Sequence, residues 1–425
     1  MKYAILFWMM AFACLIACTD DEDPVLQVSV PEESIRFVPV EGGAVMYYSL
    51  PSPTDIYTVW ARYTNAQGEE MALQATAYLD SLNLMGFNEA RQNVPVEITF
   101  TDRNNVASEP LYRTFSTLDS SPYAFLDSVE VSGGWNGIFI NYKFSKEAAG
   151  LMNVFYIGTN AYTKQADTLY VDNLQLEKGE KQVFFPINFE YDENTVVLRT
   201  EDYQGYNART KCWSGLRAYA SEQLPASEFE LLDPEEMSME NEQKAYGLKY
   251  LTDGDVKGEN RLLYKGDSKY YTYMTKAEGV GSYLIVDMKE PRVPASVRLY
   301  GMFDLSSAGL YFNDEFHLNY ADRLPCKVTL YGSNDQKSWE RLAQISQKRD
   351  GSQGCWGTPW MGPVKTKEEM DQLDPNYCEV ICPLGNTEYR YLKVQYDELF
   401  NMNPMFANDK QYVSFHELEV YVKKD

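Results

Sequence analysis

The sequence predicts an all-β protein made of several sandwich domains. Aromatic residues form 14% of the 425 residues, and 33 of them are Tyr. Short runs rich in Tyr, Val, Thr and Phe alternate between Gly, Pro and Asn, whereas no long segment repeats apolar residues at helical spacing. A chain of this length is long for one hydrophobic core, so two to four domains are expected.

The chain begins with an export signal. Lys2 precedes an apolar run over residues 4–17, too short for a membrane span of about 20 residues but suited to a signal peptide. Its end, Leu15-Ile16-Ala17-Cys18, resembles the bacterial lipobox, in which the Cys is acylated and becomes the mature N-terminus. We therefore predict that residues 1–17 are removed and that Cys18 carries a lipid anchor. An ordinary secretory signal is the alternative.

An acidic tether follows over residues 18–33. It starts with Thr19-Asp20-Asp21-Glu22-Asp23, which has no apolar residue to bury and is therefore solvated. Acidic residues behind a lipid-bearing Cys also resemble the export tag of Bacteroidetes surface lipoproteins. That resemblance implies an outer-membrane protein that faces the cell exterior.

Charge and cysteine content limit the partners and the cross-links. With 62 acidic and 38 basic residues, the formal net charge is −24, so nucleic acid and anionic lipid are poor partners, whereas neutral glycans are not excluded. Five Cys remain beyond Cys14 and Cys18, and we expect at most one or two disulfides near the C-terminus and free buried thiols otherwise. These five are Cys212, Cys326, Cys355, Cys378 and Cys382.

The first predicted sandwich covers residues 34–120. Strand-like runs alternate with turns, and the runs are Ile35–Val38, Ala44–Leu50, Tyr57–Tyr63 and Val96–Arg103. This alternation resembles a fibronectin type III domain.

A second, similar sandwich is predicted over residues 121–224. Gly42-Gly43 recurs as Gly133-Gly134 after 91 residues, and the strand-ending Asp102 recurs as Asp202 after 100. Spacings of about 100 residues suit duplicated sandwich domains.

The last module, residues 225–425, is organised around the turn Tyr250–Asp255 and a closing strand at 416–421, in which apolar and acidic residues alternate. Further strands are expected between them, at 282–287, 295–301, 327–335 and 389–395. This ordered set resembles the discoidin, or factor V/VIII type C, module, a jelly-roll sandwich of the galactose-binding-like type that often binds carbohydrate. Trp339 resembles that family's structural Trp.

The discoidin resemblance implies a structural Ca²⁺ between the first turn and the last strand. The matching positions are Asp253, Asp255 and Glu417, and carboxylate and carbonyl oxygens suit this cation. The sequence departs from the family pattern at Val256-Lys257-Gly258. A turn with solvated Asp residues and a surface Glu is the alternative.

The sugar site is predicted in the segments between strands, at 311–317 and 354–360. Trp356 and Trp360 lie among Gly and Pro and are the predicted stacking faces, with His317 and Arg323 as polar partners. Alternatively, the Trp side chains fold back onto the sandwich edge.

No catalytic motif is recognisable. His317 and His416 are the only His residues and are far apart in the sequence, so a Ser-His-Asp or Cys-His arrangement has little support. A glycoside-cleaving carboxylate pair stays open among 62 acidic residues. We expect a binding protein rather than an enzyme.

Two fibronectin-like sandwiches, a discoidin-like module and an acidic lipobox tether together resemble the Sus-type surface lipoproteins of Bacteroidetes. That resemblance implies a non-catalytic protein that holds glycan for a polysaccharide-uptake system. It also implies a TonB-dependent transporter and its glycan-capturing lipoprotein as partners. An adhesion or protein-interaction lipoprotein is the alternative, because fold alone does not fix function.

Overall fold

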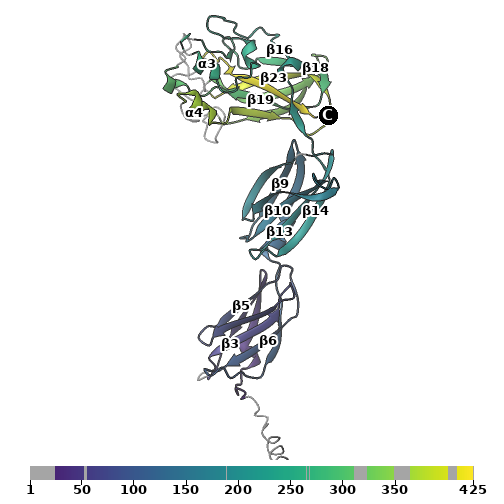
Figure 1. The fold of residues 1–425 in the computed structure, drawn as a ribbon, viewed down its shortest axis with the longest axis vertical. Helices are drawn as coiled ribbons and strands as arrows, with labels where there is room; N and C mark the ends of the chain where they lie inside the picture. Colours follow the sequence, from purple (N-terminus) through teal and green to yellow (C-terminus); the bar gives the residue numbers. More distant parts are fainter. Residues whose placement is uncertain are drawn as a thin grey trace, which may run out of the picture. The chain divides into compact units, whose positions relative to one another are not determined.

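The computed structural model describes residues 24–51, 55–187, 189–264, 266–267, 269–310, 323–348, 364–400 and 409–424. Antiparallel sheets dominate it, which confirms the predicted all-β class (Figure 1). The chain divides into two compact units, one with residues 1–131, 140–183 and 195–214 and the other with 132–139, 184–194 and 215–425. Among the described residues, no helix has the length and apolarity needed to cross a membrane. Cys18 lies outside the described residues.

The first sandwich packs three strands against four. One sheet has the order β1-β2-β5 and the other β4-β3-β6-β7, an arrangement of fibronectin- and immunoglobulin-like domains. The strands are β1 Ile35–Val40, β2 Gly43–Tyr48, β3 Thr58–Thr64, β4 Glu70–Thr76, β5 Ser81–Met85, β6 Val94–Thr101 and β7 Leu111–Phe115, and the 3-10 helix η1 (Glu32–Ser34) precedes them.

Alternation along the strands builds this core. In β3, Val59, Ala61 and Tyr63 are buried while the residues between them are partly exposed, because successive side chains of a strand point to opposite faces. The ring of Tyr63 packs edge-on against Phe115 of β7, with centroids 5.6 Å apart.

The second sandwich repeats the strand order of the first. Its sheets run β12-β9-β8 and β11-β10-β13-β14. The strands are β8 Val129–Gly134, β9 Gly137–Phe144, β10 Leu151–Thr159, β11 Ala166–Gln175, β12 Gly179–Pro186, β13 Glu193–Glu201 and β14 Asn207–Arg217, preceded by α2 (Ser121–Phe125) and η2 (Leu126–Ser128).

The repeated Asp is structural in both sandwiches. The Asp102 carboxylate accepts the backbone N–H groups of Asn104 and Val106, and that of Asp202 accepts those of Gln204 and Tyr206. Each carboxylate therefore closes the turn that follows its strand.

The repeated Gly pair aligns differently from the sequence spacing. Gly43 opens β2, where an added Cβ would lie 2.1 Å from the Leu84 carbonyl oxygen. The residue that opens β9 under the same restriction is Gly137, whose Cβ would lie 2.2 Å from the Phe185 carbonyl oxygen. Gly133 is restricted as well, because its Cβ would lie 1.7 Å from the Arg217 carbonyl oxygen, so close backbone approach requires glycine at both Gly133 and Gly137.

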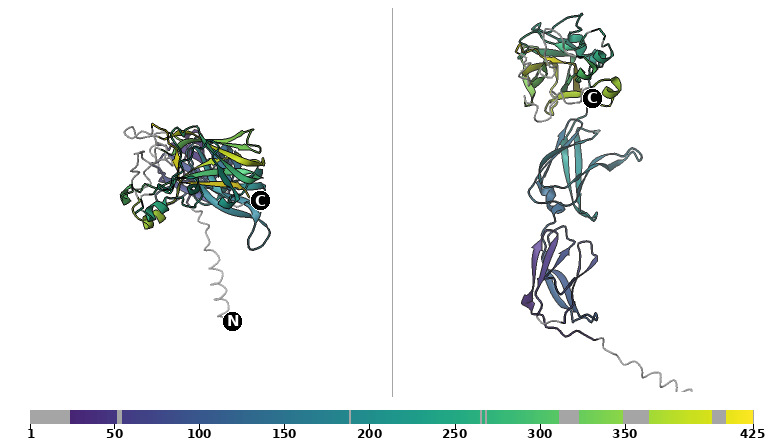
Figure 2. Two further views of the ribbon diagram at one scale, coloured as in Figure 1. Left: turned by 90° about the horizontal axis from the view of Figure 1, so that it is seen from above. Right: turned by 90° about the vertical axis from the view of Figure 1, so that its left-hand side faces the viewer.

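Strands β10 and β11 form a long hairpin that extends from the second sandwich (Figure 2). Tyr162 lies in the turn between them and is 96% exposed. It has no packing role in the sandwich.

The C-terminal sandwich faces a four-stranded sheet, β15-β25-β19-β22, with a five-stranded sheet, β16-β18-β23-β20-β21. A short pair, β17-β24, is added. The strands are β15 Ser221–Gln223, β16 Glu230–Leu232, β17 Tyr273–Met274, β18 Tyr283–Arg292, β19 Pro294–Gly301, β20 Pro325–Ser333, β21 Glu340–Ser346, β22 Asn376–Ile381, β23 Tyr389–Leu399, β24 Ser414–Phe415 and β25 Glu417–Lys423. The helical turns are η3 Ala226–Glu228, η4 Leu248–Leu251, α3 Glu259–Leu263, η5 Ser306–Ala308 and α4 Lys367–Asp371.

The predicted closing strand is half-buried, as expected, but it is an inner strand of its sheet. Strand β25 alternates buried and partly exposed residues and lies between β15 and β19. The sheet therefore includes residues from Ser221 onward, and Leu224 belongs to the core of the C-terminal sandwich.

Trp339 packs on the outer face of the five-stranded sheet. The Lys393 ammonium lies 4.9 Å from its ring centroid and 4.4 Å from that of Tyr331. Such contacts stabilise a partly desolvated cation, so Trp339 has a structural contact here.

The four described cysteines are free thiols: Cys212 is exposed, and Cys326, Cys378 and Cys382 are buried. Cys355 lies outside the described residues. Among the described cysteines, the predicted disulfides are therefore not formed.

Candidate functional site

One end of the C-terminal sandwich holds the turn with Asp253 and Asp255 and the start of the predicted closing strand, whose Glu417 contacts that turn. Strands β19, β21 and β23 finish there and β20, β22 and β25 start there, as the pairs Gly301 with Asn376 and Pro325 with Leu399 show. We call this the loop end. His317, Trp356 and Trp360 lie outside the described residues, and the described residues that flank their segments belong to this end.

Arg323 lies just before β20 at the loop end, in the interior. Its side chain is 0% exposed, and Nη1 lies 3.2 Å from the Met274 sulfur. Met274 belongs to β17 and packs in a small cluster with Tyr246, Tyr270 and Tyr412. Arg323 therefore contacts this cluster from the interior of the sandwich. That it binds a sugar hydroxyl stays a prediction.

Asp255 fixes the start of α3. Its carboxylate accepts the backbone N–H groups of Gly258, Glu259 and Asn260 at 2.7–2.8 Å, and His416 Nε2 lies 3.3 Å away. Burial alone would raise the pKa of Asp255, but the hydrogen bonds from His416 and from these N–H groups outweigh it and hold the pKa well below its usual value.

Asp253 and Glu417 form a separate carboxylate pair. Glu417 is 4% exposed, and burial, followed by the charge of Asp253, raises the pKa of Glu417 to about 8. Asp253 keeps much of its surface exposed, yet burial of its carboxylate raises its pKa as well. The backbone N–H of Gly254 donates to Glu417 at 3.3 Å.

These three acidic residues do not act as one ligand set. Within the described ranges, no group of three or more His, Cys, Asp or Glu side chains could hold a metal ion. The Asp255 carboxylate already accepts hydrogen bonds from backbone N–H groups, so it is poorly suited to be a ligand of a cation. Asp253 and Glu417 fit better, because two nearby carboxylates that repel one another are stabilised by a shared cation or proton.

Three tyrosines form an aromatic surface beside the acidic turn. We call Tyr250, Tyr264 and Tyr271 the tyrosine cluster. The ring of Tyr271 lies 5.9 Å from that of Tyr250 and 5.7 Å from that of Tyr264, and Tyr264 is 56% exposed. Helix η4, which carries Tyr250, contacts β17 and β25, so the tyrosine cluster belongs to the loop end.

Polar groups border the tyrosine cluster. The hydroxyl of Tyr271 donates to the Asp267 carboxylate, and burial, together with this hydrogen bond, raises the pKa of Tyr271 to about 12. The Lys249 ammonium lies 5.1 Å from the Tyr250 ring. Aromatic faces bordered by a cation and a carboxylate can bind a ligand that has an apolar face and hydroxyl groups.

Sequence reasoning missed the tyrosine cluster because adjacent tyrosines differ in burial. In Tyr270-Tyr271, the first ring is buried and the second is partly exposed. The available signal was Leu263-Tyr264, two exposed apolar residues at the end of a very short helix.

His416 is in the interior and faces Asp255. It therefore has no open surface on which to meet a substrate, and His317 lies outside the described residues.

Comparisons with known proteins cover parts of the chain. Residues 30–117 match a family model described as a domain of unknown function, DUF4959. No curated protein matches.

Solved structures give distant likenesses. A SusE-like protein, BT2857, matches with 13% identity and a TM-score of 0.34, over 71% of this chain and 99% of that one. A carbohydrate-binding module, CBM32-1, from a family 31 glycoside hydrolase of Clostridium perfringens, matches with 12% identity and a TM-score of 0.25, over 46% of this chain and 95% of that one. Module CpGH89CBM32-5 of the same organism, solved with GalNAc-β-1,3-galactose, matches with 9% identity and a TM-score of 0.28, over 47% of this chain and 99% of that one. At these values neither family membership nor a ligand follows.

Proposed function

We propose that the loop end of the C-terminal sandwich binds carbohydrate without cleaving it. The observation that carries the proposal is the tyrosine cluster. Its rings are partly exposed next to Lys249 and Asp267. Stacked aromatic faces beside planar or charged polar groups match the apolar face and the hydroxyl groups of a pyranose.

In this proposal, Trp356, Trp360 and His317 supply further contacts from the neighbouring segments. Arg323 is buried and contacts the Met274 sulfur, so we propose an indirect role for it at this site.

The test is binding of the intact chain to a glycan array, with Tyr264→Ala as the variant. Losing one stacking ring should weaken binding by about tenfold, or roughly 1.4 kcal/mol. Tyr162→Ala is the matched control, because it removes an even more exposed tyrosine from the second sandwich. Equal loss in both variants, or no loss in either, would contradict the assignment.

Catalysis is tested on the same glycans. The proposed function requires that incubation with the pure protein releases no new reducing ends. Release that disappears in a carboxylate variant would identify a glycosidase instead.

The finer proposal places the protein on the cell exterior. Cys18 carries the lipid anchor in the outer membrane, and the protein holds polysaccharide near a TonB-dependent transporter and its glycan-capturing lipoprotein. The lipobox and the acidic run at residues 20–23 support this location. Co-purification from detergent-solubilised outer membranes tests the partners, and an anchored protein that never co-purifies with a transporter would contradict them.

We propose calcium in a narrower form than the sequence predicted. Asp253 and Glu417 would hold Ca²⁺ with turn carbonyls, and Asp255 would only shape the turn. The fit rests on the like-charge pair, whose pKa values are both raised.

A further inference from the structure

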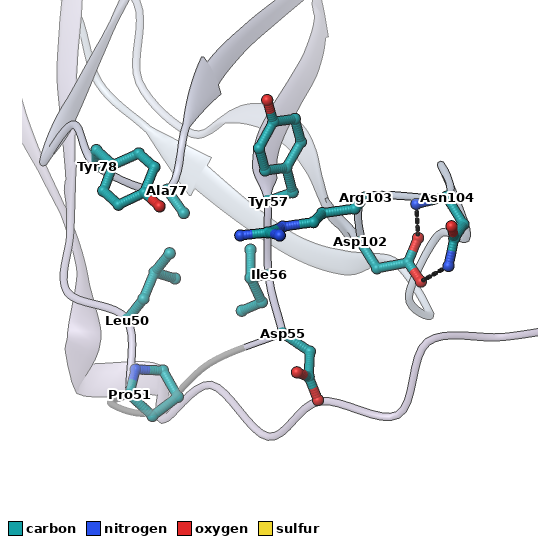
Figure 3. A pocket seen from close by; sticks show the side chains of 10 residues that line it. All are labelled: Leu50, Pro51, Asp55, Ile56, Tyr57, Ala77, Tyr78, Asp102, Arg103 and Asn104. Atoms are coloured by element: carbon teal, nitrogen blue, oxygen red, sulfur yellow. Dashed lines mark hydrogen bonds between the residues drawn. The ribbon is translucent and has the colours of Figure 1, made fainter.

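The first sandwich carries a pocket of its own. It measures about 630 Å³ and lies between the segments 50–51, 55–57, 77–78 and 102–104 (Figure 3). Its lining residues are Leu50, Pro51, Asp55, Ile56, Tyr57, Ala77, Tyr78, Asp102, Arg103 and Asn104.

Two exposed tyrosines border the pocket. Tyr78 is 85% exposed and Tyr57 is 44% exposed, and neither belongs to the hydrophobic core of this sandwich. An aromatic ring left in water at a turn adds little to folding stability. Both rings are therefore available to a ligand.

Arg103 extends into the same pocket. Its side chain passes between Tyr57 and Ile56 toward the middle of the lining residues (Figure 3). Arg62 and Arg113 of this sandwich pair with carboxylates, whereas Arg103 has no hydrogen bond or ion pair with any residue that the structure describes. A guanidinium presents five N–H donors in one plane, which suits recognition of oxygen atoms.

The turn that presents Arg103 is fixed. The Asp102 carboxylate accepts the Asn104 N–H at 2.8 Å and the Val106 N–H at 2.9 Å. The second sandwich has the same turn after Asp202, but Tyr203 stands where Arg103 does. The turn therefore does not require an arginine, and the positive charge of Arg103 is particular to this pocket.

Hydrogen bonds also hold the walls together. The Tyr57 N–H donates to the Thr101 carbonyl at 2.7 Å, and the Ala77 N–H donates to the Tyr57 carbonyl at 2.9 Å. The three segments are thus joined by backbone hydrogen bonds before any ligand arrives, which lowers the entropy cost of binding.

We infer that this pocket is a second carbohydrate site, which takes a neutral pyranose of a glycan chain. Tyr57 and Tyr78 stack on the sugar, and Arg103, Asp55 and Asn104 bind its hydroxyl groups. One guanidinium and two carboxylates line the pocket, so no positive charge excess favours an acidic sugar. The inference goes beyond the proposed function, which places binding at the loop end.

A side chain of a partner protein is the competing occupant. The buried centres of protein interfaces are mainly apolar and depleted of charge. Here three charged residues and one amide are among the ten that line the pocket, which favours the sugar.

The experiment uses the intact chain in affinity gels that contain amylopectin, galactomannan, xylan or mixed-linkage β-glucan. Arg103→Ala and Tyr78→Ala should each weaken retention by about tenfold. Tyr162→Ala, the matched control, should be retained as the wild type is. Unchanged retention of both pocket variants would overturn the inference, and is the result expected if a protein occupies the pocket.

Hydrogen exchange with an oligosaccharide of the retained polysaccharide locates the binding. Slower exchange across 55–57, 77–79 and 102–104 supports the inference. Slowing confined to residues 225–425 overturns it and leaves the proposed function standing. Slowing confined to the first sandwich supports it and overturns the proposed function, and a wild type that no gel retains overturns both.

Discussion

Asp255→Ala should destabilise the C-terminal sandwich far more than Asp253→Ala. Asp255 receives three backbone N–H groups at 2.7–2.8 Å at the start of α3. Asp253 receives the Asp255 N–H at 3.0 Å and the Asn260 side-chain amide at 3.5 Å, and it is exposed.

The magnitude follows from the donors left without an acceptor. Each unsatisfied buried N–H costs about 1–3 kcal/mol, and water that enters the vacated space recovers part of that cost. We expect a loss of about 4 kcal/mol for Asp255→Ala and less than about 1 kcal/mol for Asp253→Ala.

Urea denaturation in EDTA measures both losses. With a slope of about 2 kcal/mol per molar, the Asp255→Ala midpoint should fall by about 2 M. Because the pKa of Asp255 is lowered, its carboxylate stabilises the wild type above the usual value near 3.8, and this stability is lost as the pH falls toward the lowered pKa. The Asp255→Ala variant should not show this loss of stability as the pH falls. Equal losses at the two positions would refute the assignment of Asp255 to the helix start.

Four further outcomes are expected. Ca²⁺ should raise the melting temperature of the wild type above that in EDTA, and Glu417→Gln should abolish the response, since a ligand that binds only the folded state stabilises it; an identical melt with and without Ca²⁺ would count against the site. Cys18→Ala should end lipid labelling, and labelling that persists would remove the lipobox argument. Cys212 should react with a maleimide far faster than Cys382, because burial raises the pKa of Cys382 to about 12; equal rates would show that Cys382 is accessible. Tyr264→Ala should leave the free energy of unfolding within about 0.5 kcal/mol of the wild type, as for other exposed positions, and a larger drop would place the ring in the core.

Much of the fold was predictable because strand alternation is a local signal. Residues 282–287 and 295–301 became β18 and β19, as their apolar runs indicated. The strand order of the sheets was not visible, because it depends on pairing between distant residues. The inner place of β25 arises from Ser221–Gln223, some 200 residues earlier in the chain.

The candidate site was less predictable because burial separates chemically identical neighbours. Asp253 and Asp255 read alike in the sequence, yet one carboxylate lies beside Glu417 and the other is occupied by backbone N–H groups. Similarly, strand alternation accounts for the buried ring of Tyr63, but no sequence pattern shows that the ring of Tyr78 is left exposed beside a pocket. Such distinctions come from the packing around a turn, which sequence spacing does not encode.

The pairing of β15 with β25 also has a mechanical consequence. Strand β15 is the first strand of the C-terminal sandwich to follow the chain from the N-terminal side, and it pairs antiparallel with the last strand through Ser221–Lys423, Glu222–Val422 and Gln223–Tyr421. If Cys18 is anchored and a polymer is held at the loop end, tension along the chain enters the sandwich at β15. Strand β15 is the edge strand of its sheet, so this tension first loads its three-residue pairing with β25 and reaches the centre of the sheet only through β25, which β19 holds on its other side.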